Sequence, residues 1–423
     1  MMKTILYMSA ALAALAAGSA QAQQATNNFQ RDRNTAVTDR YQPGYEPLGV
    51  KAGVWKLNPT VTVSLGGNDN IYYVPSNKEG SAIITVSPNI VGRTTWSRHE
   101  LGFNAGVDSN VYLSQSDENN TGYNVGANGR LDITSRAMLS GNIRHLTTYE
   151  PRSAYQSDVE AAEPVRIDSD AAELQLTLIG NRLRFIGTVS TRNDDFKDVA
   201  RRAGLPGSPI ISQRYRDLTT SGATARFDYA VSPAISVFLT AVANNRRYDT
   251  ATINDSDGTV IALGTSFDIS SLARGELQLG TVTQEYKDPT IGKQDSGYVN
   301  ARVQYFPTPL TTLTGTLNRD FVDYPGSGGT TRTALNTTVG LSVDHELLRN
   351  LIVSAGVRGQ KYEFDGIDRN DTGKTVMLGA RYLMNRRISI ETKYSYVTYE
   401  SEGTQAFRDY NANVIMTSLI FAY

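Results

Sequence analysis

His145 is the histidine best placed to act as a general base, because the two other histidines, His99 and His345, fall beside predicted turns. Ser140 and Asn142 lie close to it in the sequence. A hydrolase would need a serine nucleophile, a histidine base and a polar orienting residue on one face of a sheet. Ser140 and His145 have opposite parity, so a strand would point them to opposite faces. We therefore predict no catalytic residues and no enzymatic activity.

Two groups of aspartates could bind calcium through carboxylate oxygens, namely Asp194 with Asp195 and Asp198, and Asp255 with Asp257. Neither group follows the full spacing of an established calcium loop, so solvated loop acids are the simpler interpretation. The chain has no cysteine, which excludes disulfides, thiolate zinc sites and a lipid-anchored lipoprotein. We predict no metal, and no cofactor motif is visible.

The charges nearly balance, with 41 Lys and Arg against 42 Asp and Glu, so no basic excess favours a nucleic-acid partner. A length of 423 residues with 40% hydrophobic would suit a soluble protein of two or three domains. A transmembrane barrel has a similar average, because lipid-facing apolar residues alternate with polar lumen-facing ones. The 36 glycines and 23 tyrosines suit twisted strands and aromatic girdles.

The first 22 residues have the pattern of a signal peptide. Lys3 supplies the positive start, residues 5–16 are apolar, and Ala20 and Ala22 form the small-x-small site, which predicts cleavage before Gln23. An uncleaved anchor is the alternative, but the apolar run is well short of the ~20 residues that span a bilayer. Residues 23–53 are polar and lack an apolar period, so we predict a mostly irregular periplasmic leader.

From residue 54 to the end, apolar and polar residues alternate with period 2, as in Leu174, Leu176 and Leu178 against Glu173 and Gln175. Such runs predict about 18 strands, an even number typical of a single-chain bacterial barrel. The predicted strands are 54–67, 81–96, 98–113, 121–135, 136–150, 168–180, 181–196, 213–232, 233–249, 258–271, 273–287, 295–307, 309–324, 331–346, 349–364, 373–385, 386–400 and 407–423.

The connections alternate between tight turns, such as 180–181 and 232–233, and longer polar loops, such as 151–167 and 193–212. Barrels distinguish their periplasmic and extracellular rims in this way. The fold class is therefore an all-β, transmembrane, antiparallel up-and-down β-barrel of residues 54–423, with short periplasmic turns and longer extracellular loops. Both chain termini are expected in the periplasm of a Gram-negative cell.

Aromatic residues gather near both ends of the predicted strands, as two interfacial belts would require. One row is Tyr112, Tyr149, Phe196, Tyr248, Tyr286, Phe321, Tyr362 and Tyr399, and the other is Trp55, Trp96, Tyr229, Phe267, Tyr305 and Tyr382. The last strand ends in Leu419, Phe421 and Tyr423, which resembles the C-terminal signal read by the barrel assembly machinery.

Alternation also selects charged residues that should line the lumen. The pore-lining candidates are Arg130, Arg144, Arg184, Arg192, Arg226, Arg302, Arg358, Arg381, Asp132, Glu173, Asp228, Glu276 and Glu391. Fixed charges in a narrow wet pore tune which solutes pass. The same residues could instead pair with one another and fill the lumen. Arginines and acids are too mixed along the predicted strands for the sequence to predict which ions the pore selects.

The third long loop, from Glu150 to about Asp170, carries the acids Asp158, Glu160 and Glu163. In trimeric porins the third loop folds into the pore and sets acids opposite a wall of arginines. This loop resembles that arrangement by its order and charge. A constriction loop and an ordinary surface loop both stay open as interpretations.

The segment TDRYQPGYEPLGVKAGVWKLNPTVTVSLGGNDNIYYV resembles the opening of the outer-membrane porin family called beta-barrel porin 2. The matching positions are Arg40, Pro47, Gly49, Pro59, Asp69 and Asn70, and strand rhythm extends the resemblance over nearly the whole mature chain. Where the family often has Gly-x-Phe, this chain has Gly53, Val54 and Trp55, which keeps an aromatic residue at the rim. The resemblance implies an outer-membrane barrel, some relatives of which are encoded with exopolysaccharide genes.

We expect a porin-like channel for small hydrophilic solutes or saccharides, because a barrel of about 18 strands is wide enough for water. One alternative is a barrel for polysaccharide export or surface anchoring with a plugged lumen. Another is a docking platform whose leader binds a periplasmic partner. Expected partners are outer-membrane lipid and lipopolysaccharide, the barrel assembly machinery and, in the export alternative, periplasmic polysaccharide-export components.

Overall fold

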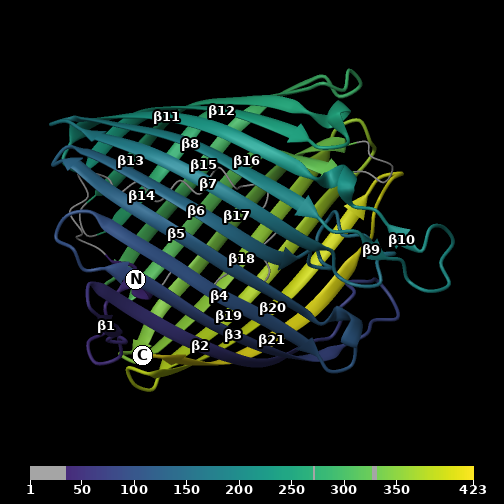
Figure 1. The fold of residues 1–423 in the computed structure, drawn as a ribbon, viewed down its shortest axis with the longest axis horizontal. Helices are drawn as coiled ribbons and strands as arrows, with labels where there is room; N and C mark the ends of the chain where they lie inside the picture. Colours follow the sequence, from purple (N-terminus) through teal and green to yellow (C-terminus); the bar gives the residue numbers. More distant parts are fainter. Residues whose placement is uncertain (1–34, 270–271, 326–330) are drawn as a thin grey trace.

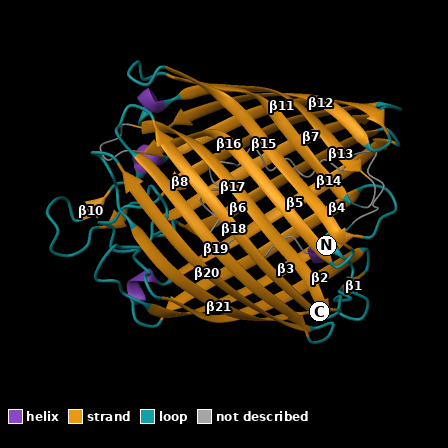
Figure 2. Cartoon of the chain, turned by 180° about the vertical axis from the view of Figure 1, so that it is seen from behind, coloured by secondary structure: helices purple, strands orange, loops and turns teal. Residues whose placement is uncertain are grey.

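The chain closes into an antiparallel β-barrel (Figures 1 and 2). The structure, a computed structural model, describes residues 35–269, 272–325 and 331–423. In these ranges 18 long strands form the wall, and pairing of β2 with β21 closes it. The all-β fold and the predicted strand number are thereby confirmed. Among the described residues, no helix has the length and apolar character needed to cross a membrane.

Neighbouring strands in the chain are also neighbours in the wall. Their bounds are β2 Trp55–Asn68, β3 Ser81–Thr94, β4 Glu100–Tyr112, β5 Asn120–Thr134, β6 Ala137–Tyr149, β7 Arg166–Ile179, β8 Leu183–Phe196, β11 Leu218–Ser232, β12 Ile235–Tyr248, β13 Ser256–Ile269, β14 Ala273–Tyr286, β15 Lys293–Thr308, β16 Thr311–Pro325, β17 Thr331–Leu348, β18 Leu351–Phe364, β19 Asn370–Leu383, β20 Ile388–Glu402 and β21 Tyr410–Ala422.

Several short elements accompany the 18 long strands. They are β1 Val50–Ala52, which pairs with the start of β2, the β9 Val199–Ala200 and β10 Ile210–Ile211 pair, and the single-turn 3₁₀ helices η1 Val37–Asp39, η2 Ser116–Glu118, η3 Arg214–Arg216 and η4 Thr252–Asn254. Because η3 precedes β11, that strand begins at Leu218 rather than at residue 213 as predicted. The third loop ends at residue 165, because β7 already begins at Arg166.

The two rims of the barrel differ. One rim, here called the turn rim, holds two-residue connections such as 135–136 and 349–350, and both marked chain ends lie there (Figure 1). The opposite rim, here called the loop rim, holds the connections 150–165 and 197–217 (Figure 2). The predicted alternation of short and long connections is confirmed.

The wall has an apolar outer face and a polar inner face. On β11, Phe227, Tyr229 and Val231 expose 55%, 44% and 56% of their surface, whereas Arg226 and Asp228 between them expose 6% and 1%. Since side chains alternate across a strand, the first set faces outward and the second faces the lumen. Lipid would cover the exposed apolar face, because hydrocarbon cannot solvate charged side chains.

The predicted aromatic belts are only half correct. At the turn rim, Trp96, Tyr229, Tyr305 and Tyr382 are between 42% and 47% exposed, as an outward-facing belt requires. At the loop rim, five members of the predicted belt are instead buried at 4–6% exposure, namely Tyr248, Tyr286, Phe321, Tyr362 and Tyr399. Four of them share strand parity with lumen-facing residues, and the side chains pack inside the barrel rather than against lipid.

Candidate functional site

The inner wall contains a network of buried ion pairs. Arg184 on β8 and Arg226 on β11 both donate to Asp228, with Nη2–Oδ1 distances of 3.1 and 2.9 Å. Arg226 also donates from Nη1 to Oε1 of Glu276 on β14, at 2.9 Å, and lies over the ring of Phe238 at 3.6 Å. Alternation predicts these four charged residues on one face, and in the structure they lie in contact with one another.

Asp228→Asn is expected to destabilise the barrel, because it leaves two buried guanidinium groups short of their shared carboxylate. Removal of one partner from a buried pair costs about 3–5 kcal/mol. The urea concentration at the midpoint of unfolding in detergent micelles should fall. Heat-modifiable gel migration measures this midpoint. The matched control is Asp257→Asn on the outer face, whose side chain is 60% exposed beside Arg247 and should cost under about 1 kcal/mol. Equal midpoints for the two variants would contradict the prediction.

Two smaller charge clusters flank this network. Towards the turn rim, Arg130 lies 3.1 Å from Asp132 and 3.8 Å from Glu100, which also faces Arg93 at 3.7 Å. Towards the loop rim, Arg192 pairs with Asp194 at 2.7 Å. Charged residues of opposite sign are therefore interleaved along the wall.

The remaining pore-lining candidates are more dispersed. Arg381 and Glu391 face each other in the register of β19 and β20. Glu173 is half-buried and accepts a hydrogen bond from Asn142 Nδ2 at 3.3 Å. Arg144, Arg302 and Arg358 face the lumen, and no ion pair involves them within the described ranges.

The loop 150–165 crosses the mouth at the loop rim and packs against the far inner wall. The centroid of the Tyr155 ring lies 4.4 Å from that of Tyr362 and 5.9 Å from that of Tyr324, in a cluster that also contains Phe364. Its hydroxyl donates to the carbonyl of Asp323 at 2.9 Å. Burial raises the pKa of the Tyr155 phenol well above its usual value, with Tyr362 and Asp323 adding to the effect.

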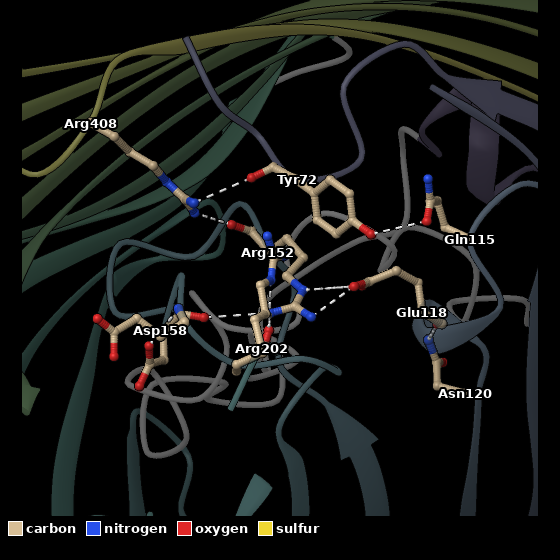
Figure 3. Close-up of polar contacts among 10 residues, drawn as sticks. Tyr72, Gln115, Glu118, Asn120, Arg152, Asp158, Arg202 and Arg408 are labelled. Atoms are coloured by element: carbon tan, nitrogen blue, oxygen red, sulfur yellow. Dashed lines mark hydrogen bonds and ion pairs between the residues drawn. The ribbon is translucent and has the colours of Figure 1, made fainter. Parts of the chain in front are cut away.

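Charged residues from other loops hold this loop at its base. Figure 3 shows Arg152 facing Glu118, with Nη2–Oε1 at 2.7 Å, and both side chains are buried. Arg408 donates to the carbonyls of Tyr72 and Arg152 from the opposite side, and Arg202 stacks over the Tyr72 ring at 4.4 Å (Figure 3). Burial lowers the pKa of Arg408 to about 10, and the positive charge of the nearby Arg152 adds to the effect.

A second buried pair joins the loop to the β8–β11 connection. Arg216 of η3 donates to Glu150, with Nη2–Oε1 at 2.5 Å, and both side chains are at most 2% exposed. Its guanidinium also lies 4.2 Å from the centroid of the Phe196 ring. The pairs of Glu150 and Arg152 therefore hold the start of the loop, and the contacts of Tyr155 hold its middle across the mouth of the barrel.

The predicted constriction acids have structural neighbours of their own. Asp158 accepts a hydrogen bond from the backbone N–H of Glu160 at 2.9 Å, and Glu160 forms an ion pair with Arg201. Glu163 is exposed. Tyr155, rather than these acids, makes the loop's contact with the opposite wall.

The ends of β16 and β17 also lean into the barrel. Pairing of β15 with β16 stops at Arg319, whereas pairing of β16 with β17 continues to the end of β16. Beyond that point, Asp323 accepts hydrogen bonds from Arg246 at 2.6 Å, Tyr286 at 2.7 Å and Tyr248 at 2.9 Å. These partners belong to the inner face of β12 and β14, so the end of β16 spans part of the lumen.

At the turn rim, the segment before β1 enters the opening of the barrel. Val37 of η1 is 1% exposed, and its N–H donates to Thr312 Oγ1 at 3.0 Å. Arg40 Nη1 lies 2.7 Å from Oε2 of Glu346, which also accepts from Gln42 at 3.3 Å. Four strands separate β17 from β2 in the wall, so this segment, here called the strap and comprising residues 35–48, crosses part of the opening.

The remaining sequence candidates lie at the chain ends. Ala20 and Ala22 fall outside the described residues. Leu419 and Phe421 lie on the outer side of β21, and the carbonyl of Tyr423 accepts a hydrogen bond from Gly49 at 3.1 Å. Within the described part of the chain, no group of three or more His, Cys, Asp or Glu side chains is placed to hold a metal ion.

Comparison with known proteins gives a family match over most of the chain. The model of the family described as "Putative beta-barrel porin 2" matches residues 42–423. No curated protein matches the sequence.

Similar solved structures include OccK9 (OpdG) of Pseudomonas aeruginosa, with 11% identity and a TM-score of 0.47 over 87% of this chain and 98% of that one. OccK2 (OpdF) of the same organism, in complex with glucuronate, has 13% identity and a TM-score of 0.47 over 87% and 98%. OccAB3 of Acinetobacter baumannii has 8% identity and a TM-score of 0.47 over 88% and 100%.

Proposed function

This chain belongs to the beta-barrel porin 2 family, and from that premise we propose that it passes small hydrophilic solutes or saccharides across the outer membrane. The observation that carries the proposal is the contrast between the two faces of the wall. The outer face exposes apolar side chains such as Phe227, whereas the inner face holds Arg184, Arg226 and Asp228. A polar interior of this kind can solvate water and polar solutes.

The proposed orientation follows from the rims. Bacterial barrels place short turns in the periplasm and long loops outside the cell. The turn rim, with the strap and the C-terminal Tyr423, would then face the periplasm. The loop rim, with the loop 150–165 across its mouth, would face the medium and select solutes before they enter the lumen.

Single-channel conductance of the refolded mature protein in a planar bilayer tests this function. We expect steady open steps, because water-filled space should remain beside the loop in a barrel of this strand number. Neutral sugars of increasing size, added to the bath, should reduce the current until they become too large to enter. A correctly folded barrel that carries no current would contradict the channel proposal.

Polysaccharide export or surface anchoring with a plugged lumen is the second candidate. This alternative is favoured by polypeptide segments that lie across both openings of the barrel, namely the loop 150–165 at the loop rim and the strap at the turn rim. A barrel plugged at both mouths would carry no current in the bilayer until both segments were removed. A steady current through the unmodified protein would exclude this alternative.

A further inference from the structure

The lumen-facing charges differ in how far they reach into water. Four lumen-facing arginines are exposed, namely Arg93, Arg130, Arg144 and Arg302. Their orientation follows from alternation, since the neighbours Ile143 and Leu101 are 62% and 45% exposed on the outer face, and Glu276 lies opposite Arg302 in the register.

Lumen-facing acids are more withdrawn. The side chains of Glu276, Glu100 and Asp132 are 28%, 25% and 21% exposed, and Asp194 and Asp228 are 10% and 1% exposed. Within the described wall strands, Asp108 on β4 is the one lumen-facing acid that is exposed. The near-neutral total charge of the chain therefore hides a lumen surface on which cations predominate.

Ion pairs with Glu100 and Asp132 offset the charges of Arg93 and Arg130, but not those of Arg144 and Arg302. Glu276, the register neighbour of Arg302, already binds Arg226 through both carboxylate oxygens. Asp194, whose charge acts on Arg144, is already paired with Arg192 at 2.7 Å. Among the described residues, no carboxylate forms an ion pair with Arg144 or Arg302, so the guanidinium donors of both remain available to a solute in the lumen.

The exposed arginines also lie on two walls. Arg144 belongs to β6, whereas Arg302 belongs to β15, the seventh strand from β6 around an 18-strand barrel. An ion that passes along the lumen therefore meets positive charge from nearly opposite directions. Fixed charges of one sign in a confined wet pore raise the local concentration of counterions.

We propose that the exposed lumen arginines Arg144 and Arg302 make the pore selective for small anionic solutes, in particular those that carry a carboxylate. The guanidinium group presents paired donors that match the two oxygens of a carboxylate. This inference rests on the proposed channel function and specifies the class of solute that the same lumen prefers.

The test is the reversal potential in a tenfold KCl gradient across a planar bilayer, followed by the same measurement with potassium acetate. The wild-type protein should favour chloride and acetate over potassium. The double variant Arg144→Gln and Arg302→Gln should lower the anion-to-cation permeability ratio by about twofold or more. The control is Arg247→Gln, an arginine on the outer face beside Asp257, which should leave the ratio unchanged.

The outcomes separate the two proposals. Current that favours potassium, or a permeability ratio unchanged in the double variant, would overturn the inference while leaving the channel in place. A folded protein that carries no current at all would overturn the channel function, and the inference with it. An equal loss of selectivity in Arg247→Gln would also overturn the inference, because that residue does not face the lumen.

Discussion

Tyr155→Ala is expected to raise the single-channel conductance and to admit larger neutral sugars. The Tyr155 side chain is 9% exposed or less, and its ring packs against three aromatic residues of the far wall, including Tyr362 at 4.4 Å. Truncation of a buried aromatic residue costs about 3–5 kcal/mol. A loss of about 3 kcal/mol shifts the equilibrium between the docked and released loop by about a hundredfold.

The control for this prediction is Tyr155→Phe. Phenylalanine keeps the ring contacts and loses only the hydrogen bond from the hydroxyl to the Asp323 carbonyl, which is worth about 1 kcal/mol. Conductance close to the wild-type value is therefore expected for Tyr155→Phe. If Tyr155→Ala gave the same conductance and the same sugar cut-off as the wild type, the loop would not limit the pore.

The base of the loop should remain ordered in both variants. Arg152 and Glu118, and separately Arg216 and Glu150, form buried pairs that do not involve Tyr155. These pairs fix the start of the loop, whereas the Tyr155 contact fixes its tip. The effect of Tyr155→Ala should therefore be confined to the mouth, without loss of heat-modifiable gel migration.

The barrel itself could be predicted from the sequence because strand alternation is local. Residues two positions apart on a strand lie on the same face, so the apolar pair Leu174 and Leu178 is enough to predict which face of β7 is the outer one. The same rule places Arg226 and Asp228 together, since they are two residues apart on one strand. The register of neighbouring strands then adds Arg184 to the network.

The contents of the two mouths could not be predicted in the same way. Tyr155 and Asp323 are 168 positions apart, and Arg40 and Glu346 are 306 positions apart, so no local pattern links them. Loop positions also lack the alternation that orients strand residues. The third loop could be identified by its length and charge, but the residue that carries its packing is an uncharged tyrosine.

The misplaced aromatic belt had a usable signal. Tyr248 has the same parity as Arg246 on β12, and Tyr286 has the same parity as Glu276 on β14. An aromatic residue that lies an even number of positions from a lumen-facing charge on the same strand is therefore predicted to point inward, where lipid cannot reach it. Position near a strand end gave the wrong face, because interfacial belts and inward packing both place aromatic residues there.

Arg40→Glu is expected to release the strap and to increase conductance through the turn rim. The change places a second carboxylate beside Glu346, whose side chain is only 8% exposed, and it removes the cation that lies 2.7 Å away. Loss of one partner from a largely buried pair costs about 3 kcal/mol or more. The strap keeps two hydrogen bonds, from Val37 to Thr312 and from Gln42 to Glu346, and each contributes about 1 kcal/mol. Its ion pair between Asp39 and Arg274 is long, at 3.9 Å, and adds less than about 1 kcal/mol.

The charge-swapped double variant, Arg40→Glu with Glu346→Arg, separates a specific pair from a general disturbance. It restores opposite charges at the two positions, so conductance should return toward the wild-type value. Lys361→Glu serves as the control, because that side chain is 51% exposed and is paired with Glu363 on the outer face. If the double variant conducted like Arg40→Glu alone, contacts other than this ion pair would hold the strap in the opening.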